Sequence, residues 1–435
     1  MKRLLLFSLL VTISLKIWSQ SGTNSPYSQF GLGILNPNIT SFNKGMSGVG
    51  YGFRTGNQVN HQNPASYSSI DSLSFIFDAG VSLQVSNFTE LGKSKTARNS
   101  NIDYVVAAFR AYRHLGVSFG MLPVTNVGYN YKTVSDVNHI STTYDKPVSY
   151  TNRYFGSGGL KQVYLGLGWE PLRGLSLGVN AGYLWGNILR NVENSYSDRH
   201  INTVMKHYNL EIRSFDVDLG LQYSQRLNTK NSVTLGLFYS LGHPLNGKQE
   251  CSIISNNFLT GVMDSTCYFI NNVYSLPQTF GAGLMYNHNN KLTIGADYEL
   301  QRWKGIEMPE LLRIGGEHKF LLVNNNFLNS NRFSIGGDYC RGERYRGIWN
   351  RIHYRIGASY VTPYVNIAGK EGPRYISASL GFGIPIINTL NNRSWLNISA
   401  DWINRYAHDM INENIFRINI GFTFNERWFA KFKVK

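Results

Sequence analysis

The sequence predicts an all-β fold: a 14-stranded antiparallel transmembrane β-barrel with an N-terminal plug. Three observations predict this fold. Apolar and polar residues alternate in many segments, the chain begins with a secretion-like signal, and no later stretch has the roughly 18 continuous apolar residues of a membrane helix. A membrane protein without helical spans must cross the bilayer as a closed barrel of strands.

The segment from Phe416 to Phe424 shows the alternation most clearly. Its phenylalanines and isoleucines occupy every second position, and arginine, asparagine, glycine and threonine lie between them. Alternate residues of a strand point to opposite faces, so one face of this strand is entirely apolar. The pattern recurs about every 15–40 residues, which favours lipid rather than a protein core as the cover for this face.

Residues 1–20 are typical of a signal peptide. Lys2 and Arg3 precede a mostly hydrophobic run from Leu4 to Leu15, and we expect cleavage near Ser19 or Gln20. The alternative is an uncleaved membrane anchor, for which the apolar run is short. No cysteine lies near the cleavage site, so a lipid-anchored N-terminus is not expected.

Residues 21–72 are rich in Gly, Asn, Ser and Pro and lack a sustained alternating face. We predict that they form an irregular plug in the barrel mouth. A disordered tail is the alternative, although such a tail would leave Phe30, Leu32 and Phe53 in water.

Residues 73–435 are predicted to form the barrel. The predicted strands are 73–88, 102–112, 115–130, 160–170, 174–189, 207–226, 231–242, 276–288, 291–304, 331–341, 350–361, 374–385, 394–405 and 413–425. The face opposite the apolar set carries charges, which would line the lumen of a barrel. In the alternative, a soluble sandwich, that face would meet water. We expect the lumenal acids to pair with two arginines, the residues being Asp216, Asp218, Asp297, Glu299, Asp401, Arg355 and Arg417.

The predicted connections alternate in length. Those at 112–115, 170–174, 226–231 and 288–291 are short, and those at 131–159, 190–206, 243–275 and 305–330 are long. Short turns are typical of the periplasmic end of such barrels and long loops of the cell surface. The apolar stretch from Leu311 to Phe320 is assigned to a loop, because bacterial barrels have even strand numbers.

Composition limits the partners. The formal charge is +16, yet the positive residues are scattered and form no nucleic-acid motif. They suit lipid headgroups, acidic surface sugars or a protein partner, or they are simply solvated. Cys251 and Cys267 share one predicted loop and are candidates for a disulfide, whereas three free thiols are the alternative. No spacing indicates a metal or another cofactor.

Short motifs resemble a known family. Asn63-Pro64-Ala65 follows the glycine-rich segment 45–52 just before the first predicted strand, an arrangement that resembles the FadL/TodX-type outer membrane transporters. The segments 25–33 and 422–429 resemble a Bacteroidetes branch of these barrels, which is related to PorV-like barrels, and 122–129 is similar to a segment of the same proteins. The chain ends in Lys435 rather than in a terminal aromatic residue.

The resemblance implies a bacterial outer membrane protein that binds outer membrane lipids and moves hydrophobic small molecules such as long-chain fatty acids. It implies that Asn63, Pro64 and Ala65 lock the plug, although a simple turn is the alternative. Phe30, Leu32 and Phe53 are candidates to line an apolar ligand pocket, against ordinary packing. Pro123 is the candidate for a lateral opening, against a plain strand end.

Two other function classes are conceivable for such a barrel. The barrel could instead be a structural or shuttle subunit of an outer membrane secretion or envelope-assembly machine, with protein partners. An enzyme is not expected. The Gly-x-Ser-x-Gly pattern at Ser118 and at Ser176 falls inside predicted strands, whereas a nucleophile elbow needs a strand-to-helix turn. The strand map brings no Ser/His/acid set together.

Overall fold

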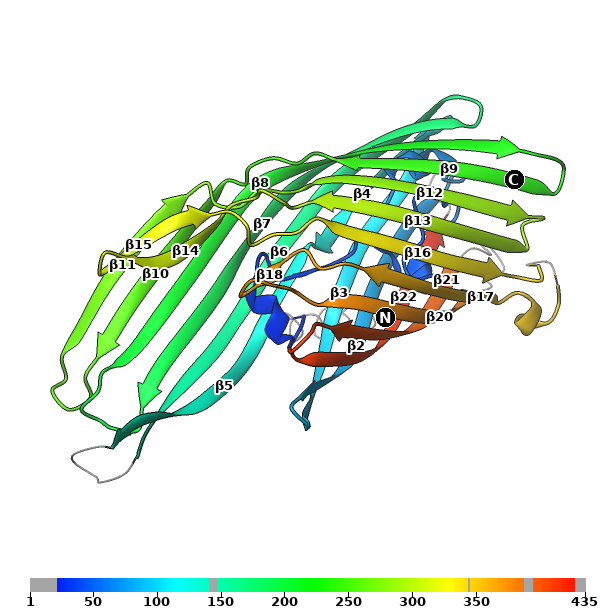
Figure 1. Ribbon diagram of the computed structural model, residues 1–435. Coiled ribbons are helices and arrows are strands. Elements are labelled where there is room, and N and C mark those ends of the chain that lie inside the picture. Colours follow the sequence, from blue (N-terminus) through cyan, green and yellow to red (C-terminus); the bar gives the residue numbers. More distant parts are fainter. Residues whose placement is uncertain (1–21, 141–146, 343–344, 387–393, 427–435) are drawn as a thin grey trace, which may run out of the picture.

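The computed structural model describes residues 22–140, 147–342, 345–386 and 394–426. Its main feature is a closed antiparallel sheet of fourteen barrel strands, as predicted (Figure 1). The ring closes where the first barrel strand, β2, pairs with the last, β22. The predicted signal peptide lies outside the described residues. No helix among the described residues is long and apolar enough to span a membrane.

The strands of the barrel follow one another around the ring in chain order. They are β2 (Phe75–Glu90), β3 (Lys93–Tyr112), β4 (Leu115–Pro123), β5 (Thr125–Ile140), β6 (Pro147–Leu172), β7 (Leu175–Tyr196), β8 (Thr203–Arg226), β9 (Asn231–Ser240), β10 (Gly247–Asn256), β11 (Met263–Asn271), β12 (Gln278–His288), β13 (Leu292–Arg302), β16 (Ser330–Tyr339), β17 (His353–Val361), β20 (Arg374–Ile386), β21 (Ser394–Tyr406) and β22 (Asn412–Glu426).

Three positions in the ring are interrupted strands. The C-terminal part of β6 pairs with β4, and its N-terminal part pairs with β5. Likewise, the C-terminal part of β8 pairs with β9, and its N-terminal part pairs with β10. β11 and β12 form the third interrupted strand, because β11 pairs with β10 and β12 with β9.

One side of the barrel is much taller than the other. β6 has 26 residues and β8 has 24, whereas β20 and β21 have 13 each. The tall strands extend together from one end of the molecule (Figure 1). The long loops predicted at 131–159, 190–206 and 243–275 are therefore wrong for most of their length. Cross-strand pairing outweighs the polar composition of these stretches.

The loop prediction for Leu311 to Phe320 is partly wrong. This stretch forms a small hairpin of β14 (Met308–Ile314) and β15 (Glu317–Val323). The hairpin is a separate two-stranded sheet, so the barrel strand number is unchanged. A second small pair, β18 (Asn366–Ile367) and β19 (Lys370–Glu371), also lies outside the barrel sheet.

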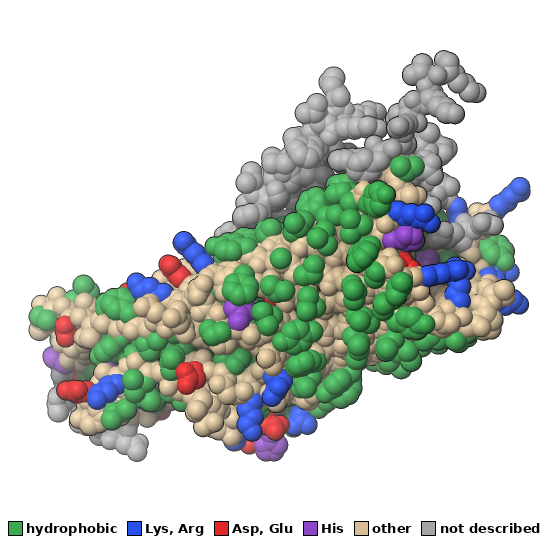
Figure 2. Space-filling view, turned by 90° about the horizontal axis from the view of Figure 1, so that it is seen from above, with side chains coloured by type: hydrophobic (Ala, Val, Ile, Leu, Met, Phe, Trp, Pro, Cys, Tyr) green, Lys and Arg blue, Asp and Glu red, His purple; other side chains and the backbone are tan. Residues whose placement is uncertain are grey.

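The apolar face of the strands points outward. On β22, Phe416, Ile418, Ile420, Phe422 and Phe424 are 38–50 % exposed, whereas the intervening Asn419 and Thr423 are fully buried. Figure 2 shows hydrophobic side chains spread over the outer wall. A soluble sandwich buries its apolar faces, so that alternative is wrong.

The N-terminal segment, residues 22–72, lies inside the barrel. It contains η1 (Pro26–Gln29), β1 (Ile34–Leu35), α2 (Ser41–Lys44) and η2 (Pro64–Ser69). α2 contacts β20, β21 and β22, and η2 contacts β4, β6, β7 and β8 on the opposite wall. The disordered-tail alternative is therefore wrong for the described part of this segment.

Glycines in register on the inner wall allow this close approach. Gly116, Gly168, Gly178 and Gly220 are cross-strand neighbours on β4, β6, β7 and β8, and we call them the first glycine row. A Cβ added at Gly178 would lie 2.2 Å from the carbonyl carbon of Pro64. η2 thus lies directly on the strand backbones, where no side chain fits.

A second glycine row faces the turn after α2. Gly295, Gly336 and Gly357 are cross-strand neighbours on β13, β16 and β17. A Cβ at Gly357 would lie 2.3 Å from the carbonyl carbon of Met46, and one at Gly336 would lie 2.7 Å from the Cβ of Met46. The two rows hold the segment between opposite walls.

The lumenal charges pair differently from the prediction. Arg355 donates to Asp338 at 2.7 Å, and Arg417 donates to Gln84. Asp297 accepts the backbone N–H groups of Gly50 and Tyr51 at 2.6 and 3.0 Å. The acids therefore bind the N-terminal segment as well as the wall, which a strand-only map could not show.

The second glycine row generates a prediction. Changing Gly357 to Ala should lower the free energy of unfolding by about 1–3 kcal/mol, because the methyl group overlaps the backbone of Met46. Chemical unfolding in detergent measures the change. Gly337→Ala is the matched control, since its nearest atom would be 3.6 Å away. Equal stability of the two variants would contradict this packing.

Candidate functional site

The barrel wall has a gap between β3 and β5. β3 pairs with β4 from Val105 to Tyr112, and its remainder from Lys93 to Tyr104 has no pairing on that side among the described residues. β5 pairs with β6 on its other edge. β4 ends at Pro123, and its pairing with β3 ends two residues earlier, at Met121. Proline donates no backbone hydrogen bond, which suits the end of a strand.

The N-terminal segment occupies this gap. β1 pairs with the free edge of β5, with Ile34 opposite Asn126 and Leu35 opposite Thr125. Farther along, the Ser28 hydroxyl bonds both backbone groups of Gly128 at 3.1–3.2 Å. On the other side, the Asn24 amide donates to a β3 carbonyl, that of Arg98, at 3.4 Å. The start of the segment thus bridges the two unpaired edges.

A cavity of about 600 Å³ opens beside the gap. Its lining combines apolar residues of β3 and β4, including Val105, Met121 and Leu122, with polar residues of β6 and β8. Gly22, the first described residue, also lines it. The gap is therefore open enough at its outer edge to admit a ligand of moderate size.

Asn63 connects the segment to the wall. Its side-chain N–H group donates to the carbonyls of Tyr51, Leu221 and Leu237 at 2.9, 3.3 and 3.2 Å. Its carbonyl accepts from the N–H of Ala65 at 3.1 Å, which makes Asn63 the N-cap of η2. Pro64 follows at the first helical position, which proline favours. All three residues of this motif are buried.

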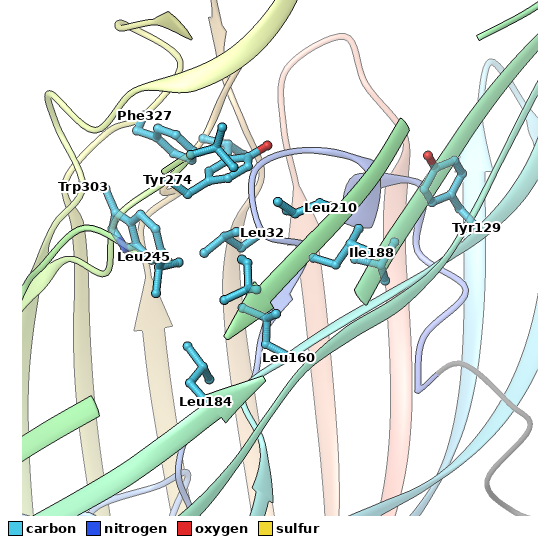
Figure 3. Packing of buried hydrophobic residues seen from close by; sticks show 14 residues of the cluster. Leu32, Tyr129, Leu160, Leu184, Ile188, Leu210, Leu245, Tyr274, Trp303 and Phe327 are labelled. Atoms are coloured by element: carbon cyan, nitrogen blue, oxygen red, sulfur yellow. The ribbon is translucent and has the colours of Figure 1, made fainter. Parts of the chain in front are cut away.

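The predicted pocket residues separate into two clusters. Leu32 is buried in an apolar cluster with residues of β5–β8 and of the later loops, among them Leu160, Ile188 and Trp303 (Figure 3). Phe30 packs against the same cluster. Phe53 lies elsewhere, with its ring 4.2 Å from that of Phe42.

A separate cavity of about 200 Å³ lies between the N-terminal segment and the inner wall. Its lining includes Asp216, Asp218, Glu299 and Arg332, and it contains neither Phe30, Leu32 nor Phe53. This cavity is charged, so it differs from the apolar pocket that the sequence predicted.

His61 lines the charged cavity and is 2 % exposed. Neither of its ring nitrogens has a hydrogen-bond partner among the described residues. Burial lowers the pKa of His61 to about 4, so the ring is neutral near pH 7. Its ring packs edge-on against Tyr164, with centroids 4.1 Å apart.

The predicted disulfide is wrong. Cys251 and Cys267 are both free, one buried and the other exposed. They lie on paired strands, but Cys251 is opposite Tyr268 and Cys267 is opposite Ser252. A register offset of one residue points the two side chains to opposite faces.

The serines of the two Gly-x-Ser-x-Gly patterns belong to no catalytic triad among the described side chains. Ser118 and Ser176 lie inside β4 and β7, in contact with Tyr164 and Ser68. The structure does bring one serine and one histidine together, Ser214 and His243, at 3.2 Å. The second ring nitrogen of His243 faces the Leu241 carbonyl at 3.5 Å rather than an acid. No metal-binding group of three or more residues occurs among the described side chains.

Sequence reasoning missed two parts of this site. One is the pairing of β1 with β5, which involves only two residues of each strand and leaves no periodic signal. The other is the pair of glycine rows. The chain is rich in glycine, and several glycines lie at equivalent positions of neighbouring predicted strands. This spacing is the signal that could have revealed the rows.

The Asn63 contacts generate a prediction. Asn63→Ala should destabilise the protein by about 2–4 kcal/mol, since it removes an N-cap and leaves buried backbone groups unpaired. Chemical unfolding and limited proteolysis of the N-terminal segment measure the effect. Asn57→Ala, a less buried position in the same segment, is the matched control. Equal protease resistance of both variants would contradict the anchoring role.

His61 generates a pH prediction. Its folded pKa lies below the usual 6.5, so the unfolded chain binds the proton more strongly. Stability should therefore fall as the pH drops from 6.5 toward 4, by up to about 3 kcal/mol from this residue. Unfolding measured across this range should show a shallower dependence in His61→Phe. Identical slopes in variant and wild type would contradict the buried neutral ring.

Comparison with solved structures shows the fold. The Pseudomonas putida toluene transporter TodX matches with a TM-score of 0.62 at 14 % identity, over 91 % of this chain and 100 % of that one. The Ralstonia pickettii toluene transporter TbuX matches at 0.61 and 14 %, over 88 % and 97 %. A Pseudomonas aeruginosa FadL homologue matches at 0.58 and 13 %, over 90 % and 98 %. The barrel is therefore of the FadL type.

The sequence itself gives a separate result. No curated protein matches the chain. The sequence model of the BamG family matches residues 1–435, the whole length. On this match, the chain belongs to the BamG family.

Proposed function

We propose that this protein is a bacterial outer membrane barrel that moves hydrophobic small molecules, such as long-chain fatty acids, through the gap between β3 and β5. The observation that carries the proposal is the gap itself, which is filled by the protein's own N-terminal segment rather than by a barrel strand. In this proposal the segment is a plug, and its displacement opens a path through the wall.

The outer surface supports a membrane location. Exposed Leu, Ile, Val and aromatic side chains occupy alternate positions on strands all around the ring. At about 25 cal/mol per Å² of apolar area, so large a surface is costly in water and favourable in lipid. Solved barrels of the same fold include two described as toluene transporters, which supports a hydrophobic substrate.

The interior supplies an apolar route to the gap. The cluster around Leu32 includes Val127 on β5 and Leu160 on β6, which lie where β1 meets the gap. Val105 and its cross-strand partner Met121, both half-buried, continue the apolar lining on the outer side. A hydrophobic ligand that passed between these groups would avoid the charged cavity of the lumen.

The contacts across the gap edges are few compared with those of the rest of the plug. At these edges residues 24–36 make a few hydrogen bonds, each worth about 0.5–1.5 kcal/mol net, and away from the edges Tyr27 and Leu32 are buried. Residues 41–69 are held by the glycine rows and by ion pairs such as Lys44 to Asp103 at 2.6 Å. We therefore propose that only the first part of the segment moves.

A disulfide tether tests this movement. Ile34 and Asn126 are cross-strand partners, so cysteines at both positions have suitable spacing. With Cys267 changed to Ser, the Ile34→Cys/Asn126→Cys variant should take up radiolabelled oleate or toluene slowly when oxidised and normally after reduction. Whole-cell uptake measures the difference.

The matched control places a tether away from the gap. Leu311 and Phe320 are partners in the β14–β15 hairpin, so Leu311→Cys/Phe320→Cys forms a similar cross-link. This control should transport equally in both redox states. Unchanged uptake by the oxidised Ile34–Asn126 tether would contradict a lateral path through this gap.

A second candidate function is a structural or shuttle subunit of an outer membrane secretion or envelope-assembly machine. Membership of the BamG family supports it. One structural feature also favours it: the β10–β11 turn at the tall side presents Phe258, Leu259, Val262 and Met263, each 53–69 % exposed. The Asn257 side chain accepts the N–H groups of Leu259 and Thr260 at 3.0 and 3.1 Å, which orders the turn.

Native mass spectrometry after gentle extraction distinguishes the two functions. A bound fatty acid on a barrel without partners supports transport. A stoichiometric protein partner that is lost in Phe258→Ser/Leu259→Ser supports the assembly function. Leu91→Ser, at the exposed β2–β3 turn, is the control and should keep that partner.

A further inference from the structure

The charged cavity between the N-terminal segment and the inner wall is bounded by two neighbouring cross-strand rows. One row is polar and crosses β8, β9, β12, β13 and β16. Its residues are Asp218, Ser240, Thr279, Gln301 and Ser330, and all of them line the cavity of about 200 Å³. Residues 34–36 of the N-terminal segment also line it. The volume is below the roughly 300–1,000 Å³ of pockets for drug-sized ligands, so it suits a small molecule.

The other row carries the two arginines of the cavity lining, and both are already paired. Arg332 lies 3.6 Å from Glu299, its cross-strand neighbour. Arg405 lies 3.1 Å from Glu413, which is also its cross-strand neighbour. The positive charges of the lining are therefore offset within their own row.

Two acids of the cavity lining have no such partner. Asp216 and Asp218 are two residues apart on β8, so their side chains lie on the same, inner face. Neither forms an ion pair with a lysine or arginine of the described part of the chain. Asp216 accepts from the Gln162 amide at 2.9 Å and from the Ser240 hydroxyl at 3.4 Å. His243 acts electrostatically on Asp216, but its ring nitrogens face other groups. Carboxylates removed from water are costly without a positive group beside them.

His61 adds an unpaired polar group to the same cavity. It is 2 % exposed, and neither ring nitrogen has a hydrogen-bond partner among the described side chains and backbone groups. Its ring packs against Tyr164, which lies in one cross-strand row with Gly182 and Asp216. A neutral imidazole has one acceptor nitrogen. The cavity therefore offers an unpaired acceptor in addition to the two carboxylates.

Aromatic rings line the cavity close to these acids. Phe238 is two residues before Ser240, the cross-strand partner of Asp218, so its side chain lies on the same inner face. The Phe238 ring stacks on that of Tyr51 with centroids 5.3 Å apart, and both residues line the cavity. Aromatic faces attract cations and also cover apolar groups.

We propose that the charged cavity binds a small organic ammonium ion, with its ammonium group at Asp216 and Asp218. The apolar part of the ligand would lie against the rings of Phe238 and Tyr51. A primary ammonium group has three N–H donors, enough for two carboxylates and the acceptor nitrogen of His61. A metal ion fits less well, because the described side chains form no metal-binding group of three or more residues.

Calorimetric titration of the full-length protein in a neutral detergent tests the proposal. The probe is 2-phenylethylamine, which is protonated near pH 7. The wild type should bind it at least about tenfold more tightly than 2-phenylethanol, which has a similar shape without the charge. Methylammonium, which lacks the apolar part, should also bind more weakly. These comparisons need no variant, so they do not depend on how a variant folds.

Asp216→Asn/Asp218→Asn should weaken binding of 2-phenylethylamine at least about tenfold, because two charge-assisted contacts are lost. Glu310→Gln/Glu317→Gln also removes two acids, on the exposed β14–β15 hairpin, and should bind normally.

Four results would overturn the proposal. They are no binding of 2-phenylethylamine by the wild type, equally tight binding of 2-phenylethanol, equal binding by the two double variants, and complete displacement of the amine by millimolar Ca²⁺, which would indicate a metal site. This inference goes beyond transport through the gap and does not depend on it. Normal oleate uptake by an Asp216→Asn/Asp218→Asn protein that no longer binds the amine would support a separate ammonium site.

Discussion

The direct contact between the N-terminal segment and the glycine rows is the constraint on which the rest of the structure depends. A backbone can lie against a strand only where no side chain intervenes, and Gly178 and Gly357 supply this space on opposite walls. Where the segment meets the wall, the fully buried Asn63 donates to carbonyl groups of two strands. The charged residues inside the barrel follow from the same geometry, because Asp297 binds N–H groups that the tight turn of the segment exposes.

The fixed central part of the segment places its first residues at the weakest position of the wall. β4 ends at Pro123 and β5 turns away from β3, so two strand edges lose their partners. β1, Ser28 and Asn24 replace part of that pairing. The same chain therefore blocks the lumen firmly and the lateral gap lightly. This division is compatible with transport through a barrel whose interior is packed. The apolar β10–β11 turn is compatible with a protein partner.

The sequence predicted the periodic part of this structure well. All fourteen barrel strands follow from alternation, and the exposed side of β22 was the predicted side. The failures are the parts without periodicity. The parts of β5–β8, β10 and β11 on the tall side are rich in polar residues, and polar composition alone resembles a loop. The Cys251–Cys267 prediction failed because register decides which face a side chain takes, and register is not visible in spacing alone. Asn63 and Pro123 were noticed through family resemblance, whereas the carbonyls that Asn63 binds come from two distant strands that no local pattern connects to it.

Hydrogen–deuterium exchange of the full-length protein in lipid bilayers tests the central claim most directly. The account predicts that backbone amides of residues 41–69 exchange as slowly as those of the barrel strands, while residues 24–36 exchange faster but remain protected relative to an unfolded peptide. Rapid exchange throughout residues 22–72 would contradict an N-terminal segment held by the glycine rows. Equally slow exchange throughout would contradict a gap that the first part of the segment can open.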